Sequence, residues 1–315
     1  MKHTIKYANF EVGSGEKLQT YLPVDGTEVK IPITIINGAG DGKQIVFTSG
    51  VHSGEYPGIE CCVEMAQEID PADVNGSIVF VHPCNPTGFE AQISYFVPED
   101  GKNLGRAFPG DPNGTLSEKI GAAITEAFFS QSCDMNVDCH GGDLHERLST
   151  FVFAPKNGTE EARRIALEVT ALMNCKFVVM TGTGLTNYLV EKGVPSIVLE
   201  RGDRGLWTRT EIDLYKKDLY NVLRYMKVID GAVNYHGPEP YVFQKCDMEY
   251  SPVSGCWHRN IELEEHFVQG QKLGEVRDFH GNVLHTVYAK YDGVCHSYWA
   301  ALSIRKGQLM VGYGA

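Results

Sequence analysis

The order of apolar and polar positions along the chain predicts strands alternating with helices over most of its length. Apolar runs and period-two alternation, both typical of strands, occur at 18–24, 29–38, 44–50, 76–85, 135–142, 149–155 and 195–202. Apolar residues at helical spacing occupy 59–69, 116–130, 159–174 and 210–229. Because strands alternate with helices of this length, we expect an α/β domain with a mainly parallel mixed sheet flanked by helices.

Turn and capping residues predict where some of these elements begin. Ser117 and Thr159 are the expected N-caps of the second and third helices. The segment 38–43, "GAGDGK", resembles a phosphate-binding loop. However, Asn37 stands where its first glycine belongs, Gln44 replaces Ser or Thr, and a strand follows instead of a helix. We interpret this segment as a hairpin turn.

The pattern changes after a turn-rich segment at 236–240, where short strands and glycines replace helices. We therefore expect two domains: an α/β domain over 1–236 and a small all-β domain over 237–315. The second resembles the barrel-sandwich of biotinyl and lipoyl domains. Its Lys290 lacks the neighbours of a modified carrier lysine, so we expect the domain to be structural or to cover a site.

Charge and cysteine content narrow the class of protein. The chain has 28 Lys+Arg against 40 Asp+Glu, a formal charge of −12, and such a field repels nucleic acid and anionic membranes. The first residues lack a signal-peptide core, and no stretch approaches the ~18 apolar residues of a membrane-spanning helix. The nine cysteines form no C-x-x-C pair. We expect a reduced, cytoplasmic protein with mostly buried thiols.

Candidate chemistry lies where predicted strands end. His52 and Glu55 follow one strand, Asp138 and His140 close another, and Glu200 closes a third. In parallel sheets ligands bind beyond these carboxyl ends, and two histidines with one glutamate are a set that holds catalytic zinc and leaves a position for water. H-x-x-E alone is a weak motif. Its combination with the other strand ends predicts one zinc ion per chain, with Glu200 as general base.

Other polar residues are weaker candidates. His82 also follows a strand, but we expect a structural role for it. His145 and Glu146 lie beyond two glycines and are expected in a loop. The glycines Gly50, Gly54 and Gly58 are expected to let backbone and substrate approach the metal. The remaining histidines are expected at surface or interface positions and not at a second metal: His258, His266, His280, His285 and His296.

Several motifs together carry a family resemblance. Between about residues 40 and 230 they are, in order, "GVHSGEYPG", "NPTGFEAQ", "DGKNLGRAFPG", "DCHGG" and "SIVLERG". The chain thereby resembles the succinylglutamate desuccinylase/aspartoacylase family, relatives of the zinc carboxypeptidases. The resemblance implies a carboxypeptidase-like α/β domain followed by a small β domain. It also implies zinc on His52, Glu55 and His140, and Glu200 as catalytic base and later acid.

The resemblance further implies that Arg106 grips a substrate carboxylate, for which a planar guanidinium is well suited. Two positions depart from the family pattern. Gly105 precedes Arg106 where the family has Asn, and the arginine expected a few residues earlier has no counterpart. Tyr95 lies near that place and is a candidate donor to an oxyanion, although packing is an equal alternative. Asn103 is a candidate for the missing polar contact.

These observations favour a zinc-dependent deacylase that cleaves the amide of a small N-acylated amino acid or related amide. Its partner is then a small N-acylated carboxylate, without nucleic acid or membrane, and a homo-oligomer is compatible with the sequence. One alternative is a metallocarboxypeptidase acting on a short peptide, which uses the same zinc core. Another is a non-catalytic, metal-holding protein that binds a small anion.

Overall fold

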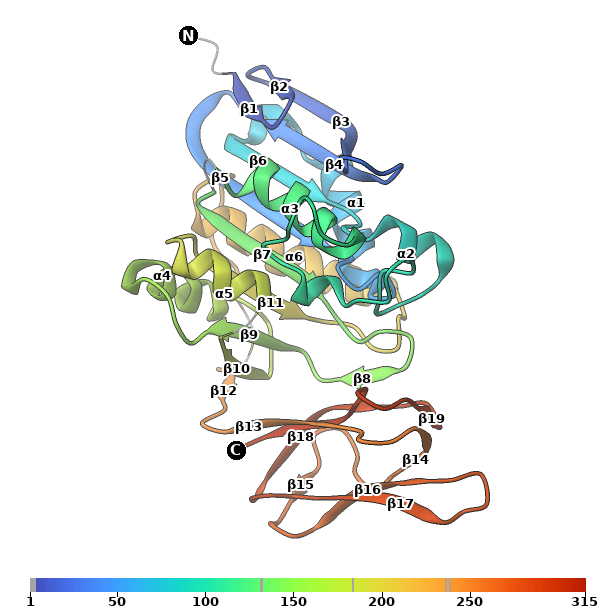
Figure 1. The fold of residues 1–315 in the computed structure, drawn as a ribbon. Coiled ribbons are helices and arrows are strands. Elements are labelled where there is room, and N and C mark those ends of the chain that lie inside the picture. The colour runs from blue at the N-terminus through green and yellow to red at the C-terminus, as the bar shows by residue number, and fades with distance from the viewer. Residues whose placement is uncertain (1–3, 131–132, 183, 236, 238) are drawn as a thin grey trace.

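The structure is a computed structural model that describes residues 4–130, 133–182, 184–235, 237 and 239–315. A large α/β part lies above a smaller all-β part (Figure 1). The chain ends in the β part (Figure 1).

The α/β part is organised around one mixed sheet in the order β12-β10-β9-β11-β7-β5-β6-β4-β3. The central strands β11, β7, β5 and β6 are parallel neighbours, while β4 pairs antiparallel with β6 and β3. The prediction of a mainly parallel mixed sheet is therefore confirmed. The strands are β3 (Glu16–Pro23), β4 (Lys30–Asn37), β5 (Gly40–Ser49), β6 (Asn75–Val81), β7 (Met135–His140), β9 (Phe151–Pro155), β10 (Phe177–Thr181), β11 (Ser196–Glu200) and β12 (Tyr241–Val242).

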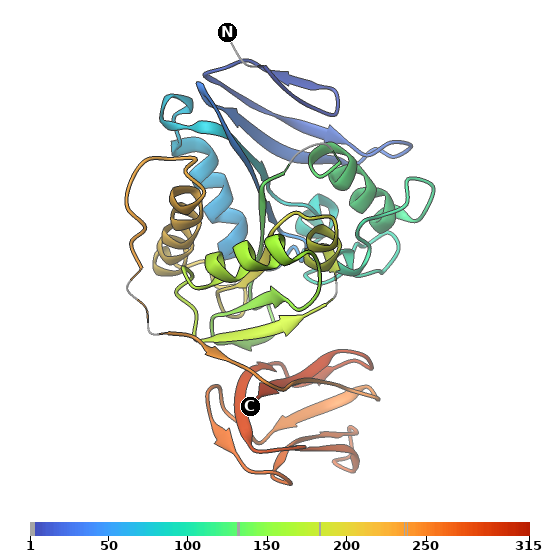
Figure 2. The same cartoon turned by 90° about the vertical axis from the view of Figure 1, so that its left-hand side faces the viewer.

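Helices cover both faces of this sheet, α1 and α6 on one side and α3 on the other (Figure 2). Strand β5 explains why, because Ile45 and Phe47 pack into the core under α1 and α6 while Val46 packs into the core under α3. The helices are α1 (Tyr56–Glu68), α2 (Pro86–Ala91), α3 (Leu116–Phe128), α4 (Glu160–Thr170), α5 (Gly184–Glu191) and α6 (Arg209–Tyr225), with 3-10 turns η1 (Pro71–Asp73) and η2 (Leu104–Arg106). Within the described ranges no helix is both long and apolar enough to cross a membrane.

One of the two predicted helix N-caps is confirmed and the other is wrong. Thr159 caps α4, since its side chain accepts from the backbone N–H of Ala162 at 3.3 Å. The prediction for Ser117 is wrong, because Thr115 is the N-cap of α3 and forms a capping box with Glu118. Ser117 is the second residue of α3, and its hydroxyl donates to Asp100 Oδ1 at 2.7 Å. Thr115 and Ser117 both carry a hydroxyl near the start of the helix, so the sequence gives the same N-cap signal at both positions. The path of the backbone into the helix decides which of them is the cap.

The hairpin predicted at 38–43 is also wrong. Strands β4 and β5 do not pair, because β6 lies between them. The connection instead passes close over the start of β6, where Gly38 N donates to Gly76 O at 2.8 Å. A Cβ on Gly38 would lie 1.8 Å from the carbonyl oxygen of Val74. Residues 40–43 already belong to β5, and glycines typical of a turn do not specify which strands pair.

The all-β part consists of two packed sheets, as the sandwich-like prediction required. One has the order β13-β20-β18-β15, the other β17-β16-β14-β19. Their shared core includes Trp257, Leu273, Tyr298 and Tyr313. The strands are β13 (Cys246–Tyr250), β14 (Gly255–Arg259), β15 (His266–Phe267), β16 (Lys272–Arg277), β17 (Val283–Tyr288), β18 (Gly293–Trp299), β19 (Ser303–Ile304) and β20 (Leu309–Gly314).

Two short strands link the parts. β8 (Glu146–Leu148), from the α/β part, pairs with β18, and β12 joins the large sheet beside β10. The N-terminal strands β1 (Ile5–Tyr7) and β2 (Phe10–Val12) pair only with each other in the described part. Residue 236, where we placed the domain boundary, lies outside the described residues, and the boundary stays a prediction.

Candidate metal centre and active site

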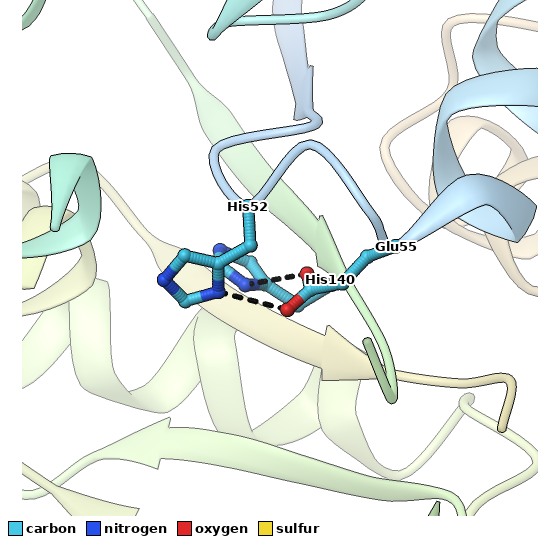
Figure 3. Close-up of side chains that lie close together, drawn as sticks. All are labelled: His52, Glu55 and His140. Atoms are coloured by element: carbon cyan, nitrogen blue, oxygen red, sulfur yellow. Dashed lines mark hydrogen bonds and ion pairs between the residues drawn. The ribbon is translucent and has the colours of Figure 1, made fainter. Parts of the chain in front are cut away.

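Three side chains from the ends of two neighbouring strands converge at the carboxyl edge of the large sheet (Figure 3). His52 lies in the turn after β5, and Glu55 is the residue that precedes α1. His140 is the last residue of β7, the strand next to β5. Parallel pairing of β5 and β7 brings their carboxyl ends to one edge, which is why residues far apart in sequence meet here.

The donor atoms of these residues point at one another. His52 Nδ1 lies 2.8 Å from Glu55 Oε1, and His140 Nδ1 lies 3.0 Å from Glu55 Oε2. Each of the three residues offers one ligand atom, and these three atoms all lie within 4.8 Å of one another. Two imidazole nitrogens and a carboxylate form a donor set suited to Zn²⁺. The residues present therefore fit the metal that the sequence predicts.

The remaining ring nitrogens are held by acceptors. His140 Nε2 lies 3.0 Å from Asp138 Oδ2, and Asp138 Oδ1 accepts from Thr48 Oγ1 at 2.7 Å. His52 Nε2 lies 3.1 Å from Asn103 Oδ1. An acceptor at Nε2 keeps a proton there and leaves the Nδ1 lone pair for a metal ion. Thr48 was missed by sequence reasoning, because a strand threonine carries no motif of its own.

Charge is concentrated at this edge. Burial opposes ionisation of Glu55, but His140 and His52 hold the pKa of its carboxyl at about 2. Burial likewise works against a charged His140, yet Asp138 and Glu55 raise the pKa of its imidazole well above the usual range. The carboxylates thus surround a position that favours positive charge, whether a proton or a metal ion.

Glu200 ends β11, directly beside His140 in the parallel register of β11 and β7. It lines the same cavity as His52 and Glu55. Burial raises the pKa of the Glu200 carboxyl well above its usual value, and only His140 opposes this shift among the principal contributors. Within the described residues its side chain forms no hydrogen bond or ion pair, so it is free to handle a proton.

The residues predicted to bind substrate lie around His52. Tyr95 stacks on the His52 ring with centroids 4.3 Å apart and lines the cavity. Burial raises the pKa of its hydroxyl, which therefore stays a donor at neutral pH. Asn103 holds His52, as described above. Arg106 ends η2 with an exposed side chain outside the cavity lining. Direct contacts of these residues with substrate stay predictions.

The cavity has a volume of about 460 Å³ and extends from the triad to the all-β part. Glu146 lies on its wall, in strand β8 and not in the loop that we expected. The β-part residues Ser297 and Trp299 lie on the same wall. The sequence offered little signal for Glu146, because a three-residue strand is too short for a periodic pattern.

Two of the three glycines singled out near the triad, Gly50 and Gly54, lie in close contact with neighbouring residues. A Cβ on Gly50, where φ is +65°, would lie 2.5 Å from the Pro83 side chain. A Cβ on Gly54 would lie 2.2 Å from Ser94 Oγ. These glycines allow tight packing of the turn that carries His52. The approach of a substrate past them stays a prediction.

The predictions for His82 and the cysteines are confirmed, whereas His296, expected at a surface or interface position, is fully buried. His82 Nε2 lies 3.0 Å from Thr34 Oγ1, and burial lowers the pKa of its imidazole to about 4, as suits a structural residue. In the described part of the chain the only cluster that could hold a metal is the triad. All nine cysteines are free thiols and most are buried.

Comparison with known proteins agrees with this architecture. Residues 41–226 match the family model described as the succinylglutamate desuccinylase/aspartoacylase catalytic domain. A curated relative is the N-alpha-acetyl-L-2,4-diaminobutyric acid deacetylase of Halomonas elongata. It is 26% identical over 272 residues, which cover 82% of this chain and 78% of that protein.

Solved structures share the fold over the whole chain. A succinylglutamate desuccinylase from Silicibacter sp. TM1040 superposes with a TM-score of 0.82 at 23% identity, covering 99% of each chain. The product-bound ectoine utilization protein EutE (DoeB) from Ruegeria pomeroyi gives a TM-score of 0.80 at 24% identity, covering 95% of this chain and 93% of that chain. At these identities the structures support the fold and not a particular substrate.

Proposed function

The chain belongs to the succinylglutamate desuccinylase/aspartoacylase family, and from this premise we propose that it is a zinc-dependent deacylase of small N-acylated amino acids. One observation carries the proposal. The Nδ1 atoms of His52 and His140 and the Glu55 carboxylate converge at the sheet edge. Glu200, a carboxylate without a partner among the described residues, lines the same cavity. The deacetylase relative from Halomonas supports an amide substrate.

His52, Glu55 and His140 would hold the zinc ion, with Asp138 and Asn103 fixing the two rings. Three protein ligands are the number found at catalytic zinc, since the fourth position stays open. When bound, zinc supplies Lewis acidity that polarises an amide carbonyl and makes water more acidic.

Glu200 moves the proton. It accepts one from the attacking water as the water oxygen bonds to the carbonyl carbon, and it delivers that proton to the amine nitrogen as the C–N bond breaks. A raised pKa suits this task because the carboxyl holds the proton between the two steps. Tyr95 donates its hydroxyl hydrogen toward the carbonyl oxygen as negative charge develops there. Arg106 orients the substrate carboxylate from η2.

Metal analysis combined with a substrate panel tests the proposal. Purified protein is expected to hold one zinc per chain and to hydrolyse N-acetyl or N-succinyl amino acids in preference to short peptides. Glu200→Gln should retain the zinc and lose at least about 100-fold in kcat. Glu160→Gln, an exposed glutamate on α4, is the matched control and should keep full activity.

Two results would contradict the proposal. Faster cleavage of peptides would favour the carboxypeptidase alternative. Bound zinc with no turnover of any amide, in wild type and Glu200→Gln alike, would favour a non-catalytic binding protein.

A further inference from the structure

The cavity wall opposite the triad is one face of a two-stranded ladder. Glu146 pairs with Trp299 and Leu148 pairs with Ser297 in the antiparallel register of β8 and β18. Because side chains alternate along each strand, these four residues share one face. All four line the cavity.

The intervening residues point to the other side of the ladder and anchor it. Arg147 Nε donates to Asp203 Oδ2 at 3.0 Å, and its Nη1 donates to the Tyr298 hydroxyl at 3.4 Å. Tyr298 is fully buried in the core of the all-β part. The pleat therefore holds Glu146 toward the cavity, and this orientation depends on the docking of the two parts of the chain.

Polar groups on this wall lack partners. Among the residues that the structure describes, the Glu146 carboxyl forms no hydrogen bond or ion pair. Ser297 is only 1% exposed, and its buried hydroxyl also has no hydrogen-bond partner among the described residues. Arg305 and Lys306 line the cavity, but their side chains are exposed in the turn between β19 and β20. Buried polar atoms of this kind are normally satisfied, so their presence marks a place where a ligand supplies the bond.

The surroundings favour a cation. Burial raises the pKa of the Glu146 carboxyl well above its usual value, and nearby Asp143, Glu200 and Glu55 raise it further. A positive group bound beside Glu146 would relieve both effects. Trp299, Phe151 and Tyr250 supply aromatic walls to the same cavity, and alkylammonium groups bind well between aromatic rings and a carboxylate.

We propose that Glu146 binds a positively charged side-chain amine of the substrate, with Ser297 as a second polar contact. The substrate class is then an N-acylated diamino acid whose other amine is free. The deacylation of that substrate rests on the proposed function, whereas recognition of the amine is a binding property that can be measured alone.

The test compares matched ligands in binding experiments. The ligands are Nα-acetyl derivatives of 2,4-diaminobutyrate, ornithine and lysine, each paired with the isostere that has methyl in place of ammonium. Calorimetry on the full chain, in the Glu200→Gln background to prevent turnover, measures the Kd of each. We expect at least one ammonium ligand to bind about tenfold or more tightly than its isostere, and Glu146→Gln to reduce that ratio below about threefold. Ser297→Ala should reduce it by a smaller factor.

Glu160→Gln again serves as the matched control, and its ammonium-to-methyl ratio should equal that of the parent. Absence of any preference for ammonium in all three pairs would overturn the inference, as would a preference that survives Glu146→Gln. Hydrolysis by the wild-type chain is scored separately. If ammonium preference is lost with Glu146 but no ligand is hydrolysed, the proposed function fails and the amine site stands.

Discussion

The two walls of the cavity are built on different principles. On the triad wall, every ring nitrogen of His52 and His140 has an acceptor, from Glu55, Asp138 or Asn103. On the opposite wall, Glu146 and Ser297 have no partner among the described residues. The first wall is organised before any substrate arrives, as reaction chemistry requires. The second wall is completed by what binds, which is typical of a surface that selects a substrate.

The walls also differ in what supports them. The triad residues follow or end adjacent strands of one sheet. The backbone pairing of these strands holds their carboxyl ends together without any contribution from the β part. Glu146 depends on the pairing of β8 with β18, that is, on contact between the two parts. Three predictions test this contrast, from the largest expected effect to the smallest.

The largest effect concerns the organised wall. Asp138→Asn should weaken zinc binding by about 10- to 100-fold, because the carboxylate that holds His140 Nε2 is lost. Competition with a chelator measures the metal Kd. Asp134→Asn is the control, since Asp134 accepts from Gln44 N just before β7 begins, far from the triad end of that strand. Equal metal affinity in the Asp138 variant and wild type would show that the triad is not organised by its partners.

A second prediction compares a histidine of the triad with a buried histidine of the β part. Neighbouring carboxylates raise the pKa of His140, but His296 on β18 lies between Phe151 and Phe243, where burial lowers its pKa to about 3. Its stabilising contribution is therefore full above the usual pKa of about 6.5 and is lost as the pH falls toward 3. At pH 5 this loss is about 2 kcal/mol.

Urea unfolding at pH 8 and pH 5 measures it. His296→Gln should lose less stability than wild type between the two pH values, whatever its stability at pH 8. His280→Gln, at an exposed position, should behave like wild type. An unchanged difference in the His296 variant would contradict the assigned environment.

The smallest effect concerns whether η2 or the β part binds the substrate carboxylate. Arg106→Ala should raise KM about tenfold with little change in kcat, because a charged contact made equally in ground and transition states is lost. Arg305→Ala, at the exposed mouth on the β part, should raise KM less than about threefold. The reverse order in steady-state kinetics would move carboxylate recognition from η2 to the β part.

Much of the site was predictable because its signals are local. His52 and Glu55 lie on one turn after an apolar strand, and His140 and Glu200 each end a strand of the same kind. The general behaviour of parallel sheets then brings these ends together. The wrong predictions involve choices between equivalent local signals, as with Ser117 and Thr115, or pairings that skip a neighbour, as with β4 and β5.

The sequence by itself determined the α/β pattern, the family and the candidate metal-binding set, because periodicity and short motifs are properties of neighbouring residues. Only the tertiary structure decided that Glu146 faces the cavity. Its strand of three residues has no period to recognise, and its direction follows from backbone hydrogen bonds to β18, a strand more than a hundred residues later in the chain. Pairing over that distance depends on how two separate cores dock, which no local pattern encodes.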